Sequence, residues 1–182
     1  EEPWFAALFA RDGADRARRF MVDGGVVRGV QVRVQEMTGA PGDTFFDIVR
    51  AGAEAAAAKD NIELRYSSDP QAPNQANLVQ SAIDSKVNGI ALTLAKPDAM
   101  APAVKAALDA GIPVVAFNSG FDQFKAMGVQ EYFGQDEKLA GVAAGERLNK
   151  DGAKKVICVI QEQGQVALES RLVVRSSASS NS

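Results

Sequence analysis

The stretch that decides the fold class is residues 90–117, IALTLAKPDAMAPAVKAALDAGIPVVAF. Ile90–Leu94 and Val114–Phe117 are short apolar runs, which are typical of strands buried on both faces of a sheet. Between them, Asp98 can cap a helix whose apolar residues recur at helical spacing and which Gly111 ends. A strand, a helix and a second strand in this order predict a βαβ unit with parallel strands.

The same alternation extends in both directions from this unit. Period-2 and helical patterns predict strands at Val30–Val34 and Asn61–Ser67, helices at Thr44–Lys59, Asn74–Val87 and Asp136–Lys150, and a last strand at Val156–Ile160. Strands begin roughly 25–30 residues apart, which is the separation that a parallel crossover connection needs. We therefore predict an α/β fold with a doubly wound parallel sheet.

The absence of histidine weakens every catalytic interpretation of the chain. Neither a Ser-His-Asp nor a Cys-His pair can be assembled without it, and the common zinc sites lose their usual ligand. Cys158 is the single cysteine, so it can form neither an internal disulfide nor a multi-thiolate metal site, and we expect it to be a small buried apolar residue. We predict that the chain is not an enzyme and uses no cofactor and no metal.

Charge and hydropathy restrict the partners of the chain. Its 182 residues carry a formal net charge of −3, which argues against nucleic acid because a phosphate backbone calls for a basic face. No apolar run approaches the roughly 18 residues that a membrane span requires, so we expect no direct membrane insertion. Residues 1–21 also lack the basic start, apolar run and cleavage site of a signal peptide.

The loops that follow the predicted strands carry the candidate binding residues, because ligands of open parallel sheets bind beyond the carboxyl ends of the strands. Asp43, Phe45 and Phe46 follow the first strand, where a ring can lie against the C–H face of a polyol and the carboxylate can accept its hydroxyl protons. Alternatively, Asp43 caps the helix and Phe46 faces the core, as we favour for Phe46. Asn118 can hydrogen-bond a neutral hydroxylated ligand or form an Asx turn, and Asp136 can cap a helix.

Four stretches together resemble a known family: residues 42–47 (GDTFFD), 74–83 (NQANLVQSAI), 87–90 (VNGI) and 110–118 (AGIPVVAFN). They are similar in order and spacing to the sugar-binding proteins of bacterial ABC importers, the ribose-binding-like periplasmic binding proteins of type I. The resemblance runs from about residue 38 to Arg171. It implies a solute-binding protein of the cell envelope, periplasmic or otherwise extracytoplasmic, that captures a sugar or polyol and presents it to the permease subunits.

The resemblance also implies which residues bind the ligand. The family's polar residue and paired aromatics fall on Asp43, Phe45 and Phe46, its Asp-Arg pair falls on Asn118-Ser119, and its arginine in the second lobe falls on Arg171. The expected ligand-binding set is Asp43, Phe45, Phe46, Asn118, Ser119, Asp136 and Arg171. This chain has the uncharged residues Asn118 and Ser119 where the family has a charged Asp-Arg pair. We therefore expect its ligand to be a different polyol or a sugar derivative rather than a plain pentose or hexose.

Members of this family have two hinge-linked lobes, which implies a division of the chain. We expect an atypical extension at 1–29, the N-terminal ligand-binding lobe at 30–135, a hinge-proximal helix and first strand of the second lobe at 136–171, and a Ser-rich tail at 172–182. On this expectation the chain is truncated, with one nearly complete lobe and the start of another. Residues 1–37 contain six arginines and no lysine, and we hypothesise that both ends are foreign sequence.

Two other function classes remain open at this point. The effector-binding domain of a lactose-repressor-type transcriptional regulator uses the same fold. However, residues 1–37 show no helix-turn-helix pattern, and their six arginines are matched by six acidic residues. A doubly wound enzyme would need catalytic groups, and the pattern reveals no pair of carboxylates placed for acid–base chemistry.

Overall fold

The structure is a computed structural model that describes residues 32–38 and 44–178, with side chains from 44 to 172. Its strands form one sheet in the order β2-β1-β3-β4-β5, and every neighbouring pair is parallel. The strands are β1 (Val32–Thr38), β2 (Ile62–Ser68), β3 (Gly89–Thr93), β4 (Val114–Phe117) and β5 (Tyr132–Phe133). The predicted α/β fold with a doubly wound parallel sheet is therefore confirmed.

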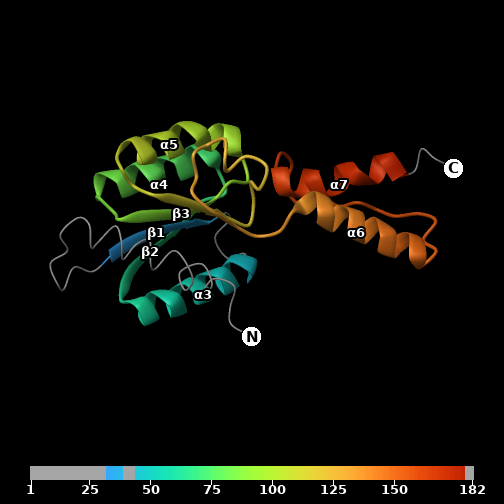
Figure 1. Cartoon of the computed structure of the whole chain (residues 1–182), viewed down its shortest axis with the longest axis horizontal. Helices are drawn as coiled ribbons and strands as arrows, with labels where there is room; N and C mark the ends of the chain where they lie inside the picture. Colours follow the sequence, from blue (N-terminus) through green and yellow to red (C-terminus); the bar gives the residue numbers. More distant parts are fainter. Residues whose placement is uncertain (1–31, 39–43, 179–182) are drawn as a thin grey trace.

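Helices cover both faces of this sheet and continue beyond one end of it (Figure 1). With the labels of Figure 1, they are α3 (Thr44–Asp60), α4 (Ala72–Asp84), α5 (Pro97–Asp109), α6 (Glu137–Lys150) and α7 (Val166–Ala178). α3 lies on one face, and α4 and α5 lie on the other. α6 and α7 pack against each other outside the sheet. No helix in the described part of the chain has both the length and the apolar character to cross a membrane.

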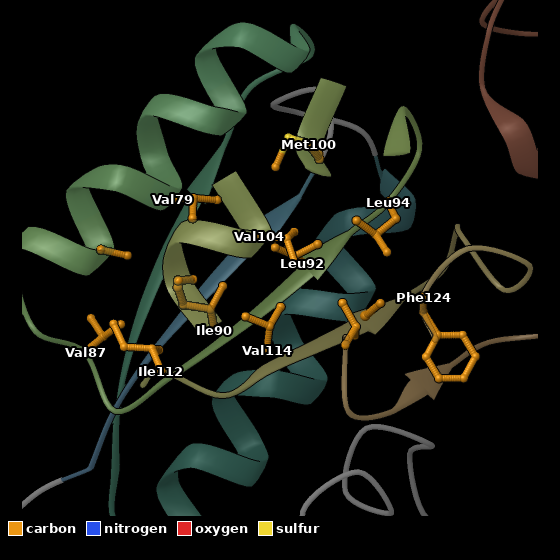
Figure 2. Packing of buried hydrophobic residues seen from close by; sticks show 14 residues of the cluster. Val79, Val87, Ile90, Leu92, Leu94, Met100, Val104, Ile112, Val114 and Phe124 are labelled. Carbon is orange, nitrogen blue, oxygen red and sulfur yellow. The ribbon is translucent and has the colours of Figure 1, made fainter. Parts of the chain in front are cut away.

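The core consists of two clusters because successive residues of a strand point to opposite faces. Ile90 and Leu92 of β3 belong to the larger cluster beneath α4 and α5, together with Val104 and Val114 (Figure 2). Ala91, between them in β3, belongs to the smaller cluster beneath α3. Small alanines on the buried side of α3 let this helix lie close to the sheet.

Most predicted elements are present with shifted ends. The strand predicted at Val30–Val34 runs from Val32 to Thr38, and the helix predicted at Asn74–Val87 runs from Ala72 to Asp84. Pro73 lies in the first turn of that helix, where a missing N–H costs nothing. β5 was not predicted, since two residues are too few to show a period.

The strand predicted at Val156–Ile160 is wrong. Residues 154–161 make no backbone hydrogen bond to the described part of the chain, and the side chains of Ile157 and Val159 are 90% and 79% exposed. Cys158 is also exposed, which corrects the expectation that it is buried. β-branched residues favour a strand only where a neighbour supplies backbone partners and a packing surface, and no described strand lies beside this segment.

The ends of the chain fall largely outside the described residues. The expected extension at 1–29 and the candidate ligand residue Asp43 lie there entirely. The Ser-rich tail expected at 172–182 is helical at its beginning, because α7 continues to Ala178.

A glycine sets the distance between α6 and α7. A Cβ atom added to Gly141 of α6 would collide with the backbone carbonyl of Arg171 in α7. A Cβ atom added to Gly145, one turn further along α6, would have no atom within 4 Å. The two helices therefore pack backbone to backbone at Gly141 but not at Gly145.

We expect Gly141→Ala to lower the free energy of unfolding by about 1–3 kcal/mol, because overpacking forces the two backbones apart. Gly145→Ala is the matched control, and its better helix propensity is expected to raise stability by about 1 kcal/mol. Urea unfolding followed by circular dichroism measures both. Equal stabilities for the two variants would contradict the close packing of α6 on α7.

Candidate functional site

The candidate residues gather at the edge of the sheet where the parallel strands end. A shallow, open pocket lies there, with a cavity volume of about 10 Å³. It is lined by residues 120–123 after β4, residues 136–138 at the start of α6, and Val166, Ala167 and Ser170 of α7. Of the candidate ligand residues that the structure describes, Asp136 alone lines this pocket, which lies where the sheet meets the α6–α7 pair.

Asn118 occupies an unusual backbone conformation at the end of β4. Its φ is +64°, in the left-handed region that asparagine tolerates better than most residues. The N–H of Asn118 donates to the carbonyl of Phe133 (2.9 Å), and its own carbonyl accepts from the Tyr132 hydroxyl (2.8 Å). Its half-buried side-chain amide makes no hydrogen bond to the described residues, so the backbone is fixed while the amide remains available to a ligand.

Ser119 turns inward directly after Asn118. Its side chain is buried, and its hydroxyl has no hydrogen-bond partner among the described residues. Gly120 follows with a φ of +100°, and a Cβ there would collide with Leu94. The loop after β4 is thus packed tightly against the end of β3, and of the two predicted contacts only Asn118 is partly exposed.

The paired aromatic rings at the start of α3 point in different directions. Phe46 is 7% exposed and packs in the cluster beneath α3, which confirms the core position that we favoured for it. Phe45 is 47% exposed, and the two ring centroids are 5.2 Å apart in an edge-to-face arrangement. Phe45 therefore presents part of its ring at the surface at the start of α3.

Asp136 caps α6, as predicted. Its Oδ1 accepts from the backbone N–H groups of Lys138 (2.9 Å) and Leu139 (3.1 Å). Lys138 in turn pairs with Asp122 of the loop after β4 (2.9 Å), and this hydrogen bond raises the pKa of Lys138. The cap and the ion pair together hold the start of α6 against the sheet edge.

Arg171 is held by a buried carboxylate that the sequence did not reveal. Its Nε–H donates to Oε2 of Glu137 (2.6 Å), and Glu137 is 7% exposed. The hydrogen bond with Glu137 raises the pKa of Arg171. Gln135 also donates from Nε2 to both carboxylate oxygens of Glu137 (3.2 and 3.3 Å).

Tyr132 lies close to this carboxylate and binds Asn118. Its single hydroxyl proton is donated to the Asn118 carbonyl at 2.8 Å, and the carbonyl of Gln135 lies 3.5 Å away. Its ring packs against Phe121 (5.4 Å between centroids) and Phe124 (5.7 Å). Two neighbouring sets of hydrogen bonds therefore lie here, one from Tyr132 to Asn118 and one from Gln135 and Arg171 to Glu137.

Two further contacts join the sheet edge to the segment before α7. Lys96 pairs with Glu162 (2.6 Å), and the N–H of Val166 donates to the carbonyl of Ala95 (3.1 Å). Within the described residues, no three histidine, cysteine, aspartate or glutamate side chains come together to hold a metal ion. The candidate residues Phe45, Asn118 and Arg171 carry an aromatic ring, an amide and a guanidinium, groups that suit a neutral hydroxylated molecule.

Glu137 and Tyr132 could not be found from the sequence for physical reasons. Glu137 is separated by 34 residues from Arg171, and the contact depends on how α6 and α7 pack. Tyr132 belongs to a strand of two residues, which gives no pattern. The one local signal was the acidic pair Asp136-Glu137 at a predicted helix start, which is explained equally well by the helix dipole.

Known proteins resemble the chain in sequence and in fold. Residues 37–174 match the sequence model of a periplasmic binding protein domain. A carbohydrate transporter from Acidothermus cellulolyticus 11B, solved in complex with myo-inositol, is 53% identical, with a TM-score of 0.79 over 81% of this chain and 52% of that one. No curated protein matches the sequence significantly. These matches confirm the resemblance seen in the sequence.

More distant solved structures share the fold. An ABC transporter solute-binding protein from Burkholderia graminis C4D1M, in complex with D-arabinose, is 23% identical, with a TM-score of 0.75 over 83% of this chain and 53% of that one. A periplasmic sugar-binding protein from Legionella pneumophila is also 23% identical, with a TM-score of 0.75 over 81% of this chain and 56% of that one. The chain spans about half the length of these structures.

Removing the Tyr132 hydroxyl tests the hydrogen bond to Asn118. We expect Tyr132→Phe to lower the free energy of unfolding by about 1 kcal/mol near neutral pH, because the Asn118 carbonyl loses its donor. Burial, and then the charges of Glu137 and Asp136, raise the pKa of Tyr132 from 10.0 to about 12. The folded state therefore holds the phenol proton more tightly, so this contribution is complete below pH 10 and is lost as the pH rises through 12.

Urea unfolding of both proteins between pH 8 and pH 12 measures the effect. The stability difference between wild type and Tyr132→Phe is expected to narrow above pH 10. A difference that stays constant over this range would contradict the raised pKa.

Proposed function

The chain belongs to the periplasmic binding protein domain family, and from this premise we propose that it forms one wall of a cleft that captures a sugar or polyol for an ABC importer. The role is binding without catalysis, outside the inner membrane, with the loaded protein delivered to the permease subunits. The observation that carries the proposal is the 53% identity, over 81% of the chain, to a carbohydrate transporter in complex with myo-inositol.

The chemistry of the site supports a neutral polyol. Phe45 offers an exposed ring for the C–H face of the ligand, and the Asn118 amide can both donate to and accept from hydroxyl groups. Arg171 keeps its two terminal nitrogens without hydrogen bonds to the described residues. A ligand such as myo-inositol, with a hydroxyl on every ring carbon, can use all three groups.

This chain covers about half of each matched structure. We propose that the second wall of the cleft corresponds to the part of those structures that this chain does not cover. On this view, residues 30–135 form the ligand-binding lobe, and residues 136–171 begin the second lobe. The backbone bond between Val166 and Ala95 and the ion pair between Lys96 and Glu162 support this division, because both join the two parts at the strand ends. A transcriptional regulator's effector domain is not favoured, since the matched structures with a stated function are transport proteins.

Titration of the ¹⁵N-labelled chain with myo-inositol, D-arabinose and D-allose, followed by heteronuclear NMR, tests the proposal. We expect myo-inositol to shift the signals of Phe45, Asn118 and Arg171, with a dissociation constant on the order of millimolar because one wall encloses little of the ligand. Glycine betaine, which has no hydroxyl groups, is the control. If no sugar or polyol shifted these signals, the proposed site would be wrong, and micromolar affinity would contradict the need for a second wall.

Asn118→Gly tests the role of the amide without straining the backbone, because glycine readily adopts a positive φ. We expect it to weaken binding of myo-inositol about 2–10-fold, the equivalent of one neutral hydrogen bond. Asn61→Gly is the matched control, since Asn61 also has a positive φ (+55°) but precedes β2 at the opposite edge of the sheet. Equal affinities for the two variants would exclude a ligand contact by Asn118.

A further inference from the structure

We propose that Glu137 is a positioning residue that fixes the Arg171 guanidinium beside the cleft and neutralises its charge, so that the site prefers neutral polyols to anionic sugars. The inference rests on the proposed function and adds a residue to it. Neither the order of the elements nor a sequence motif indicates this role for Glu137. Three observations on the packing of α6 against α7 support it.

The first observation is the set of hydrogen bonds around the Glu137 carboxylate. Oε2 accepts from Nε of Arg171 (2.6 Å), and both oxygens lie within hydrogen-bond distance of the Gln135 amide. Because the carboxylate is buried, it needs a cation and donors to remain charged. Arg171 meets this need with Nε alone, so its terminal N–H groups remain available for ligand hydroxyls.

The second observation is that one face of α6 holds both the backbone and the head group of Arg171. Glu137 and Gly141 are four residues apart, which places them on the same side of the helix. Gly141 lets the Arg171 carbonyl approach the α6 backbone, while Glu137 holds the far end of the side chain. A long side chain fixed at both ends loses little freedom when a ligand binds.

The third observation is the balance of charge at the site. Glu137 and Arg171 form an ion pair with no net charge, and Lys138 and Asp122 form another next to it. Burial, and then the charges of Glu137 and Asp136, raise the pKa of Tyr132. Arg171 can therefore donate hydrogen bonds without presenting an unbalanced positive charge to anions.

Glu137→Gln tests the inference, because it keeps the shape and the acceptor oxygen but removes the charge. Glu146→Gln is the matched control, since Glu146 is an exposed residue of the same helix. The probes are myo-inositol and D-glucuronate, whose dissociation constants are measured by NMR shift titration. We expect Glu137→Gln to change their ratio about tenfold in favour of glucuronate, and Glu146→Gln to change it less than about twofold. An equal loss of affinity for both probes would reduce Glu137 to a structural role and overturn the inference.

A measurement without ligand separates this inference from the proposed function. The Nε–H resonance of Arg171, assigned by its loss in Arg171→Lys, is expected to exchange slowly with water in the wild type and in Glu146→Gln, and quickly in Glu137→Gln. An unchanged exchange rate in Glu137→Gln would show that Glu137 does not hold Arg171, even if both probes bind. Conversely, a wild type that binds neither probe would overturn the proposed function, while the resonance still decides the role of Glu137.

A second variant covers the case in which Glu137→Gln does not fold. Glu137→Asp keeps the charge but withdraws the carboxylate by one methylene. We expect it to speed exchange of the Arg171 Nε–H while it retains the preference for myo-inositol. Loss of that preference with the charge intact would contradict the electrostatic part of the inference.

Discussion

The parallel pairing of the strands is the constraint on which the rest of the structure depends. Because β1, β2, β3 and β4 run in the same direction, each connection must return across a face of the sheet, and α3, α4 and α5 do so. All the strands therefore end at one edge. The start of α3 with Phe45, the loop with Asn118 and the segment that leads to α6 all follow strand ends at this edge, although they are far apart in the sequence.

A buried carboxylate then organises what lies beyond that edge. Glu137 accepts hydrogen bonds from Arg171 of α7 and from Gln135, and the neighbouring Tyr132 donates to the Asn118 carbonyl. Removing the Arg171 guanidinium would leave the buried Glu137 carboxylate without its cation, so the desolvation cost would add to the loss of the bond. The Glu137 carboxylate thus joins the start of α6 to α7.

The sequence predicted the sheet better than the site. Ile90–Leu94 and Val114–Phe117 were found because a strand buried on both faces must be apolar throughout. Val156–Ile160 shows the same composition and is not a strand, since composition cannot supply a neighbouring strand. Phe45 and Phe46 are adjacent residues of the same type, so the sequence does not distinguish them. Only the packing of α3 decides which ring is buried. The Glu137–Arg171 contact depends on a helix pair that no local pattern encodes.

The two edges of the sheet have a consequence for the behaviour of the lobe in solution. β5 has two residues, so it presents almost no ladder of unpaired backbone groups to another molecule. β2 is longer, but Glu63 and Arg65 place a charged pair along it (3.0 Å), and charged side chains on an outer strand disfavour pairing with a foreign strand. Short length on one side and charge on the other therefore protect the described sheet from edge-to-edge aggregation.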